Sequence, residues 1–239
     1  MQLLEGRGVT KHFGGLAAVS EVNFAIGRGE VVGLIGPNGA GKTTLFNLIS
    51  GALVPEAGTI RLQGESIGGL KPHAICRRGL ARTFQSVRVF PHLSAHANVQ
   101  LAALFGRSGW SSVAQADRET VELLEFVGLA DVGAVPAKDL KLPIQKRLEV
   151  ARGLAAKPQI LLLDELMAGL NPTEVGEAMG LVTRIRERGV TLFLIEHVMK
   201  AIMGVCDRII VLHHGKKIAE GTPQEIATSR TVIDVYLGE

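Results

Sequence analysis

The first third of the chain has the short apolar runs and glycine turns that are typical of β-strands. Positions 19–26 alternate roughly between apolar and polar residues, which predicts a half-buried strand. Residues 31–35 form an apolar run next to glycines, and this predicts a fully buried strand. We expect a helix over 43–50, stopped by Gly51, and another short strand over 59–63.

The middle of the chain, from about 86 to 158, changes to helical periodicity. Two apolar series recur at i, i+3, i+6 and at i, i+4, i+7, i+11. They are Val121, Leu124 and Val127, and Ile144, Leu148, Ala151 and Ala155. Between expected helices, the small and polar residues of 107–115 predict a loop.

The strand pattern returns in the last third. Apolar strands are expected over 160–163, 191–195 and 209–212, with a helix over 173–187. The prediction is therefore an α/β core with a helical insertion. We expect one domain over 1–239, in which 1–85 and 159–239 form the core lobe and 86–158 form a helical subdomain.

Composition limits the functional classes. A chain of 239 residues can bury one good core, and its net charge is only +3. One Trp and one Tyr leave almost no platform for stacking bases, so we expect no nucleic acid partner. Cys76 and Cys206 are far apart in the sequence and not part of a CxxC pair, which predicts small buried side chains in a reducing compartment.

The sequence predicts no targeting or membrane segment. Residues 1–7 lack the basic and then apolar pattern of a signal peptide. The longest stretch without Asp, Glu, Lys or Arg, residues 89–106, contains a proline, histidines and amides and would be a poor bilayer span. We expect a soluble cytoplasmic protein whose link to a membrane comes through partners.

A glycine-rich loop between an expected strand and an expected helix matches the pattern GxxxxGK[ST]. Glycines let backbone N–H groups turn toward a polyphosphate, and the helix N-terminus adds partial positive charge. Lys42 would reach the β- and γ-phosphates, Thr43 would ligate Mg²⁺, and Thr44 would add a hydroxyl to the α-phosphate. The loop consists of Gly36, Pro37, Asn38, Gly39, Ala40, Gly41, Lys42 and Thr43.

Two acids end the apolar strand expected at 160–163. Asp164 would lie beside the metal, and Glu165 could orient or deprotonate an attacking water. Two acids at the end of a core strand are common by themselves. Because a phosphate loop lies about 120 residues upstream, a nucleotide site is the favoured interpretation.

With these motifs in order, the chain resembles the ATP-binding subunits of ABC transporters along essentially its whole length. Phe13 is similar to the aromatic residue that stacks on adenine in that family. Gln85 resembles the glutamine that touches the metal and the nucleophilic water, and His197 resembles the histidine that contacts the γ-phosphate. Taken alone, Gln85 would more often be a solvated loop residue and His197 the cap of a strand end, whereas a core position in an early strand is the less favoured alternative for Phe13.

The resemblance implies a P-loop NTPase core with an antiparallel β subdomain and a helical insertion. It implies ATP and Mg²⁺ as cofactors, with Thr43, Gln85 and Asp164 near the metal and Glu165, His197 and Gln85 in catalysis. The implied partners are a second ATPase subunit, two membrane-spanning permease subunits and, indirectly, an extracytoplasmic substrate-binding protein. The implied location is the cytoplasmic face of the inner membrane.

Stretches such as 168–174 and 216–223 most resemble the branch that takes up branched-chain and other hydrophobic amino acids. Other cargoes, such as urea, amides or exported lipid, remain alternatives because the ATPase does not touch the cargo in this family. A soluble ABC ATPase linked to nucleic acid and a module that binds nucleotide without hydrolysis are the rival functions.

The chain departs from the family at the LSGGQ signature, which contacts ATP held by the opposite subunit. Lys141 stands for the serine, Leu142 and Pro143 stand for the two glycines, and Ile144 stands for the glutamine. Pro143 has no N–H, and Leu142 adds bulk where a backbone must approach closely. Two interpretations stay open, since the charge of Lys141 could replace the lost hydrogen bonds or this half of the site could be weak. Because a homodimer would have the altered signature at both sites, we predict a heterodimer with a related ATPase.

In the helical insertion, we expect a permease-docking groove lined by Val87, Val89, Phe90, Leu93 and Val99. The alternative is that most of these residues belong to the ordinary core.

Overall fold

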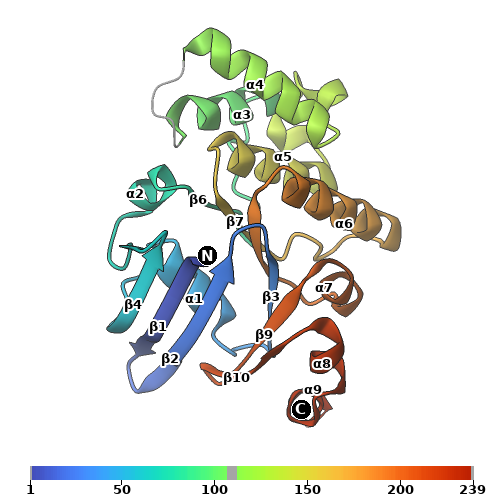
Figure 1. Cartoon of the computed structure of the whole chain (residues 1–239). Helices are drawn as coiled ribbons and strands as arrows, with labels where there is room; N and C mark the ends of the chain where they lie inside the picture. The colour runs from blue at the N-terminus through green and yellow to red at the C-terminus, as the bar shows by residue number, and fades with distance from the viewer. Residues whose placement is uncertain (1, 107–111, 238–239) are drawn as a thin grey trace.

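The computed structural model describes residues 2–106 and 112–237. In that part of the chain the strands form two sheets, and a layer of helices lies beyond one end of the larger sheet (Figure 1). The larger sheet has the order β10-β9-β3-β8-β7-β6, in which β10 is antiparallel and the other strands are parallel. Its strands are β3 (Val31–Ile35), β6 (Leu80–Arg82), β7 (Ile160–Asp164), β8 (Thr191–Ile195), β9 (Arg208–His213) and β10 (Lys216–Gly221).

The central strands β3, β7 and β8 are buried at every position, as continuous apolar runs in a parallel sheet should be. The carboxyl ends of these strands meet at one edge, where ligands bind in open α/β sheets. The helices that flank this sheet include α1 (Lys42–Ile49), α6 (Pro172–Glu187), α7 (Met199–Val205), α8 (Pro223–Thr228) and α9 (Arg230–Leu237).

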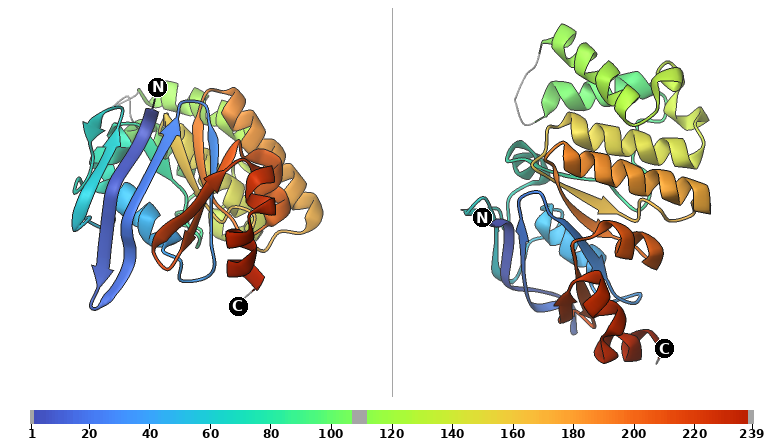
Figure 2. Two further views of the ribbon diagram at one scale, coloured as in Figure 1. Left: turned by 60° about the horizontal axis from the view of Figure 1, so that its bottom comes forward. Right: turned by 45° about the vertical axis from the view of Figure 1, so that its right-hand side comes forward.

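The smaller sheet is antiparallel, in the order β2-β1-β4-β5, and it lies across α1 from the larger sheet (Figure 2). Its apolar face packs into the same core as α1 and one face of the larger sheet, and Phe24, Phe46 and Phe193 stack there. The predicted antiparallel β subdomain is thereby confirmed. Its strands are β1 (Gln2–Phe13), β2 (Leu16–Gly27), β4 (Ala57–Leu62) and β5 (Glu65–Ser66).

A helical layer lies between β6 and β7 in the chain and forms the upper part of Figure 1. It consists of α3 (Ala95–Phe105), α4 (Val113–Phe126) and α5 (Leu142–Ala155), with short 3₁₀ turns at Ala130–Val132 and Ala137–Asp139. The short helix α2 (Pro72–Arg77) precedes β6. No helix within the described residues is long and apolar enough to cross a membrane.

The structure corrects the expected loop over 107–115. Residues 107–111 lie outside the described part, but 113–115 form the first turn of α4. The side chain of Ser112 caps this helix by accepting a hydrogen bond from the backbone N–H of Gln115. The prediction was wrong there because small polar residues are typical both of loops and of helix N-termini.

Candidate nucleotide site

The phosphate loop, residues 36–43, connects β3 to the first turn of α1. Gly36 has φ 150° and Gly41 has φ 101°, a region that L side chains rarely adopt. A Cβ on Gly36 would lie 2.1 Å from the carbonyl oxygen of Leu212, and one on Gly41 would lie 2.3 Å from the carbonyl oxygen of Ala18. The loop is therefore held against backbone at two points where glycine alone fits.

Lys42 folds back over its own loop. Its Nζ donates to the carbonyl oxygens of Gly36 at 2.5 Å and Pro37 at 2.9 Å. Burial lowers the pKa of Lys42, while the negative charges of Glu165 and Asp164 raise it. A phosphate group would offer this ammonium a charged acceptor in place of neutral carbonyls, which makes a stronger hydrogen bond.

Asp164 ends β7 and is paired with Arg82, a residue to which the sequence alone gave no role. Nη2 of Arg82 donates to Oδ2 of Asp164 at 2.7 Å, and both side chains are buried. Burial raises the pKa of Asp164, and the Arg82 guanidinium lowers it in part. The other carboxylate oxygen, Oδ1, is buried and has no hydrogen-bond partner in the described part of the chain.

This donor set fits Mg²⁺ bound together with a nucleotide. The described residues contain no cluster of three or more His, Cys, Asp or Glu side chains that could hold a metal ion by themselves. Mg²⁺ bound with nucleotides usually keeps several waters and takes one or two protein oxygens besides phosphate oxygens. The orphaned Oδ1 of Asp164 and the exposed hydroxyl of Thr43 are oxygens of that kind.

Glu165 is brought together with Gln85 and His197, which lie 80 and 32 residues away in the sequence. Nε2 of Gln85 donates to Oε2 of Glu165 at 2.9 Å, and Nε2 of His197 lies 2.8 Å from Oε1. The backbone of Glu165 has φ 54°, and its N–H donates to the carbonyl oxygen of Ile195 at 2.9 Å. A non-glycine residue in this left-handed region costs of order 1–3 kcal/mol and is typical of functional sites.

Glu165, Gln85 and His197 line one pocket of about 270 Å³ together with most of the phosphate loop. Gly36, Pro37 and Asp164 are not among its lining residues. The predicted residues among its lining are Asn38, Gly39, Ala40, Gly41, Lys42, Thr43, Thr44, Gln85, Glu165 and His197. Leu16, Ala17, Ala18 and His214 also line the pocket and were missed, because they lie in β-hairpin turns or strand ends that carry no motif.

Phe13 lies at the end of β1 and pairs with Leu16, the first residue of β2. Its side chain is 49% exposed, and the Nζ of Lys11 lies 5.7 Å from the ring centroid. Phe13 does not line the pocket described above, whereas its neighbour Leu16 does. The ring is thus an exposed aromatic surface beside the phosphate site.

The residues that replace the signature lie at the start of α5. Lys141 is the N-cap residue, and Pro143 lies in the first turn. Lys141 and Leu142 are exposed. A Cβ added to Gly169 would lie 3.8 Å from Cδ2 of Leu142, so this end of α5 reaches the loop that follows Glu165.

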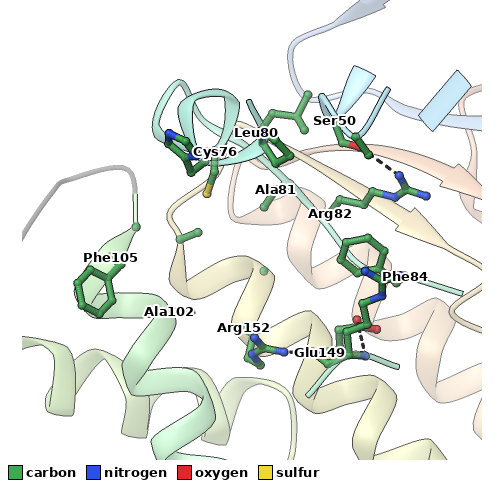
Figure 3. A pocket seen from close by; sticks show the side chains of 17 residues that line it. Ser50, Cys76, Leu80, Ala81, Arg82, Phe84, Ala102, Phe105, Glu149 and Arg152 are labelled. Atoms are coloured by element: carbon green, nitrogen blue, oxygen red, sulfur yellow. Dashed lines mark hydrogen bonds between the residues drawn. The ribbon is translucent and has the colours of Figure 1, made fainter. Parts of the chain in front are cut away.

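A second cavity, of about 440 Å³, lies between the α2–β6 region and helices α3 and α5 (Figure 3). Arg82 and Phe84 line it on one side, and Glu149 and Arg152 project from α5 on the other. The guanidinium of Arg152 also packs 4.9 Å from the ring centroid of Phe90. Arg152 therefore contacts both the cavity and Phe90, which does not itself line it.

The predicted groove residues divide into three groups, which are exposed, partly buried and buried. Phe90 is 44% and Leu93 is 40% exposed, so both are available to a partner. Val99 is fully buried in the core that the helical layer shares with one face of the larger sheet, and its predicted place in a groove is wrong. It packs there as an ordinary core residue. Val87 and Val89 are partly buried, and Val89 packs against the same core.

Comparisons with known proteins agree with this site. The ABC transporter family matches residues 19–168, and the branched-chain amino acid ATP-binding cassette transporter family matches residues 216–239. The high-affinity branched-chain amino acid transport ATP-binding protein BraF of Pseudomonas aeruginosa is 43% identical, and LivG of Escherichia coli K12 is 42% identical, each over 99% of this chain and 98% of the relative. The lipopolysaccharide export system ATP-binding protein LptB of Escherichia coli K12 is 35% identical over 100% of this chain and 98% of the relative.

Similar solved structures are also ATP-binding cassettes of ABC transporters. An ATP-binding cassette of an ABC transporter in its ADP conformation has a TM-score of 0.87 at 25% identity, with all of both chains covered. A dimeric cassette in a post-hydrolysis state, bound to ADP and Pi, has a TM-score of 0.84 at 26% identity over 92% of this chain and 99% of that one. Since the first family match contains the phosphate loop, Asp164 and Glu165, this chain belongs to the ABC transporter family as a nucleotide-binding subunit that hydrolyses ATP.

Proposed function

We propose that Glu165 is the general base of this ATPase and that Gln85 and His197 fix it in position. The observation that carries this role is that each carboxylate oxygen of Glu165 has its own hydrogen-bond partner. A carboxylate fixed at both oxygens can accept a proton from a water that attacks the γ-phosphate. His197 is partly exposed and would also contact the γ-phosphate.

The remaining pocket residues would bind the nucleotide. Lys42 and the N–H groups of the loop over 36–43 would hold the β- and γ-phosphates, Thr44 would reach the α-phosphate, and Phe13 would stack on adenine. Thr43, Asp164 and the amide oxygen of Gln85 would hold Mg²⁺. The ion would neutralise charge on the phosphate oxygens. We propose that residues 1–85 and 159–239 form the lobe that binds the nucleotide. Residues 86–158 would form the helical subdomain that contacts partners.

We further propose that the working unit is a heterodimer with a second ABC ATPase. The nucleotide pocket described here has its phosphate loop and Glu165 in place, so a partner with an ordinary signature would complete it. The start of α5 is different, because Pro143 offers no N–H and Leu142 is bulky and exposed. A homodimer would have this altered segment at both ATP sites.

The test is the association state of the Glu165→Gln variant in Mg²⁺-ATP, measured by light scattering. Loss of the base should trap any closed dimer that can form. We expect a monomer that binds ATP when the chain is alone, and a dimer when the related ATPase is added. Dimerisation of the variant alone would contradict the heterodimer.

The proposed function is to drive the uptake of branched-chain or other hydrophobic amino acids. The chain would act on the cytoplasmic face of the membrane, bound to its permease subunits. Two relatives named for branched-chain amino acid transport are 42–43% identical to this chain, whereas the lipopolysaccharide export relative is 35% identical. The match over 216–239 supports the same branch. Two permease subunits and an extracytoplasmic binding protein would then provide the path and the recognition of the cargo.

Uptake of radiolabelled leucine by cells carrying Lys42→Ala tests this cargo. We expect leucine uptake through this system to be lost, while uptake of urea and amides stays unchanged. Loss of urea or amide uptake with normal leucine uptake would assign the transporter to the alternative cargo.

The surface around Phe90 and Leu93, with the adjoining cavity of Figure 3, is the proposed permease-docking site. Exposed apolar side chains beside a cavity suit a short partner helix. Phe90→Asp and Leu93→Asp should abolish co-purification with the permease and leave ATP binding intact. Val113→Asp, on an exposed position of α4, is the matched control. Normal co-purification of the Phe90 and Leu93 variants would remove the docking site.

A further inference from the structure

Lys146 is a buried lysine on α5 that the nucleotide site does not use. Its side chain lies one helical turn after Leu142, and the residue is only 6% exposed. Nζ donates to the carbonyl oxygens of Glu165 at 2.8 Å, Leu166 at 3.1 Å and Ala168 at 2.6 Å. An ammonium group has three N–H donors, so these bonds use its full capacity.

Glu196 contacts the same segment from the other side. It lies between the end of β8 and His197, and it is 2% exposed. Oε1 accepts a hydrogen bond from the N–H of Met167 at 2.7 Å. The backbone of residues 165–168, which we call the base segment, is therefore held at three carbonyls by Lys146 and at one amide by Glu196.

Burial disfavours the charged form of both side chains, and nearby charges offset part of this effect. Burial lowers the pKa of Lys146, whereas the negative charges of Glu196, Glu165 and Glu149 raise it. Burial raises the pKa of Glu196, whereas the hydrogen bond from the N–H of Met167 and the charge of Lys146 lower it. Polar groups this deeply buried are costly to leave without hydrogen-bond partners, so their bonds to residues 165–168 hold that segment in place.

The base segment matters for chemistry because it begins at Glu165. The carboxylate of that residue is held by Gln85 and His197, but its backbone has the strained φ of 54°. Such a conformation persists when the surroundings over-determine it. Lys146 binds the carbonyl of Glu165 itself, and Glu196 is joined directly to His197 in the chain.

We propose that Lys146 and Glu196 are positioning residues for ATP hydrolysis, which clamp the base segment and so hold Glu165 against its two side-chain partners. Lys146 lies on the helix whose start carries the altered signature. The clamp therefore connects the dimer-facing end of α5 to the base. This inference rests on the proposed role of Glu165.

The experiment compares kcat for ATP hydrolysis with the Kd for a fluorescent ATP analogue, in the full chain assembled with its transporter partners. Lys146→Met removes three hydrogen bonds and should lower kcat roughly tenfold or more, because a misplaced base loses part of its effect. The Kd should stay within about twofold, since Lys146 does not line the nucleotide pocket. Lys146→Arg keeps the charge and donors and should recover much of kcat.

Two substitutions of Glu196 test the same proposal with less disturbance of the fold, in case Lys146→Met does not fold. Glu196→Gln keeps an oxygen that accepts from Met167 and should retain most of kcat, whereas Glu196→Leu loses the acceptor and should lower it roughly tenfold. Lys157→Met is the control, because Lys157 follows α5 but pairs with Glu119 on the surface. Its kcat should be unchanged.

Two results would overturn the clamp. Equal kcat values for Glu196→Gln and Glu196→Leu would show that the hydrogen bond to Met167 does not act on the base. A loss of ATP affinity in parallel with kcat would show a general structural role. Glu165→Gln is measured beside them, because normal hydrolysis by that variant would instead reject Glu165 as the base.

Discussion

Arg82 forms a buried ion pair with Asp164, the residue directly before Glu165 in the chain, with Nη2 and Oδ2 2.7 Å apart. The same guanidinium donates to Asn47 at 2.7 Å and to Ser50 at 3.1 Å, both on or just after α1. Arg82 thereby connects the end of β7 to the helix that follows the phosphate loop. The pair leaves Oδ1 of Asp164 for another partner.

We predict that Arg82→Met lowers the free energy of unfolding by about 3–5 kcal/mol, because it leaves the buried carboxylate of Asp164 without its partner. Urea denaturation monitored by circular dichroism measures this change. Arg7→Met, which breaks an ion pair with Glu5 at an arginine that is 74% exposed, should cost less than about 1 kcal/mol. Similar losses of unfolding free energy in the two variants would show that the buried Arg82–Asp164 pair contributes no more to stability than an exposed ion pair.

Substitution of Gly36 and of Gly39 separates two costs within one loop. One is the steric clash of an added Cβ, and the other is the strain of a positive φ in a residue other than glycine. Gly36→Ala should cost about 2–3 kcal/mol of unfolding free energy, because its Cβ would meet the carbonyl oxygen of Leu212. Gly39→Ala should cost only about 1 kcal/mol, since a Cβ there meets nothing within 4 Å in the described chain and only φ 78° is unfavourable. Thermal unfolding without nucleotide gives both values, and equal costs would argue against the close approach of Leu212.

Much of the core was predictable because its strands are continuous apolar runs between glycines. The expected strands over 31–35 and 191–195 coincide with β3 and β8, and the expected helix over 173–187 differs from α6 by one residue. The phosphate loop could be predicted because its chemistry requires residues adjacent in the sequence. Gln85 and His197 needed the family resemblance, since each lies alone in its own stretch of the chain.

Other features could not be predicted from local pattern. Arg82, Lys146 and Glu196 are charged residues that the sequence gives no reason to bury, and their partners lie 82, 19 to 22 and 29 residues away. The groove prediction was wrong at Val99 because an apolar residue in a helical insertion packs inward or outward according to neighbours that sequence spacing does not identify. Tertiary packing decides such positions.

The buried carboxyl of Glu196 predicts a pH dependence of stability. Burial raises its pKa from 4.5 to about 7, although the amide of Met167 and the charge of Lys146 lower it in part. Between these pH values the folded chain holds a proton that the unfolded chain has lost, so stability falls as the pH rises from 4.5 to 7. The size of this fall is up to about 3 kcal/mol.

Urea denaturation at pH 5 and pH 8 measures this effect, with Glu196→Gln as the comparison. The variant should lose less stability than the wild-type chain over that range, because its amide does not ionise. Asp164 and Glu149, whose pKa values are also raised by burial, contribute equally to both proteins and cancel in the difference. Identical changes in the two proteins would show that Glu196 does not titrate in this range.

Restoring the signature should convert the chain into a homodimer. The triple variant Lys141→Ser, Leu142→Gly, Pro143→Gly returns a hydroxyl to position 141, removes the side chain at 142 and gives position 143 a backbone N–H, at the start of α5 where partner-bound phosphate would lie. In the Glu165→Gln background with Mg²⁺-ATP, we expect light scattering to show a dimer, whereas Glu165→Gln alone stays monomeric.

Lys141→Ser alone is the matched control for this prediction. Serine at the N-cap of α5 should stabilise the helix by about 1 kcal/mol without restoring the N–H at position 143 or removing the bulk at 142, so the single variant should remain monomeric. A triple variant that binds ATP but does not dimerise would place the obstacle to self-association outside the signature. In that case the exposed Leu142, which lies beside Gly169 in the loop after Glu165, would not be what prevents a second copy of the chain from binding.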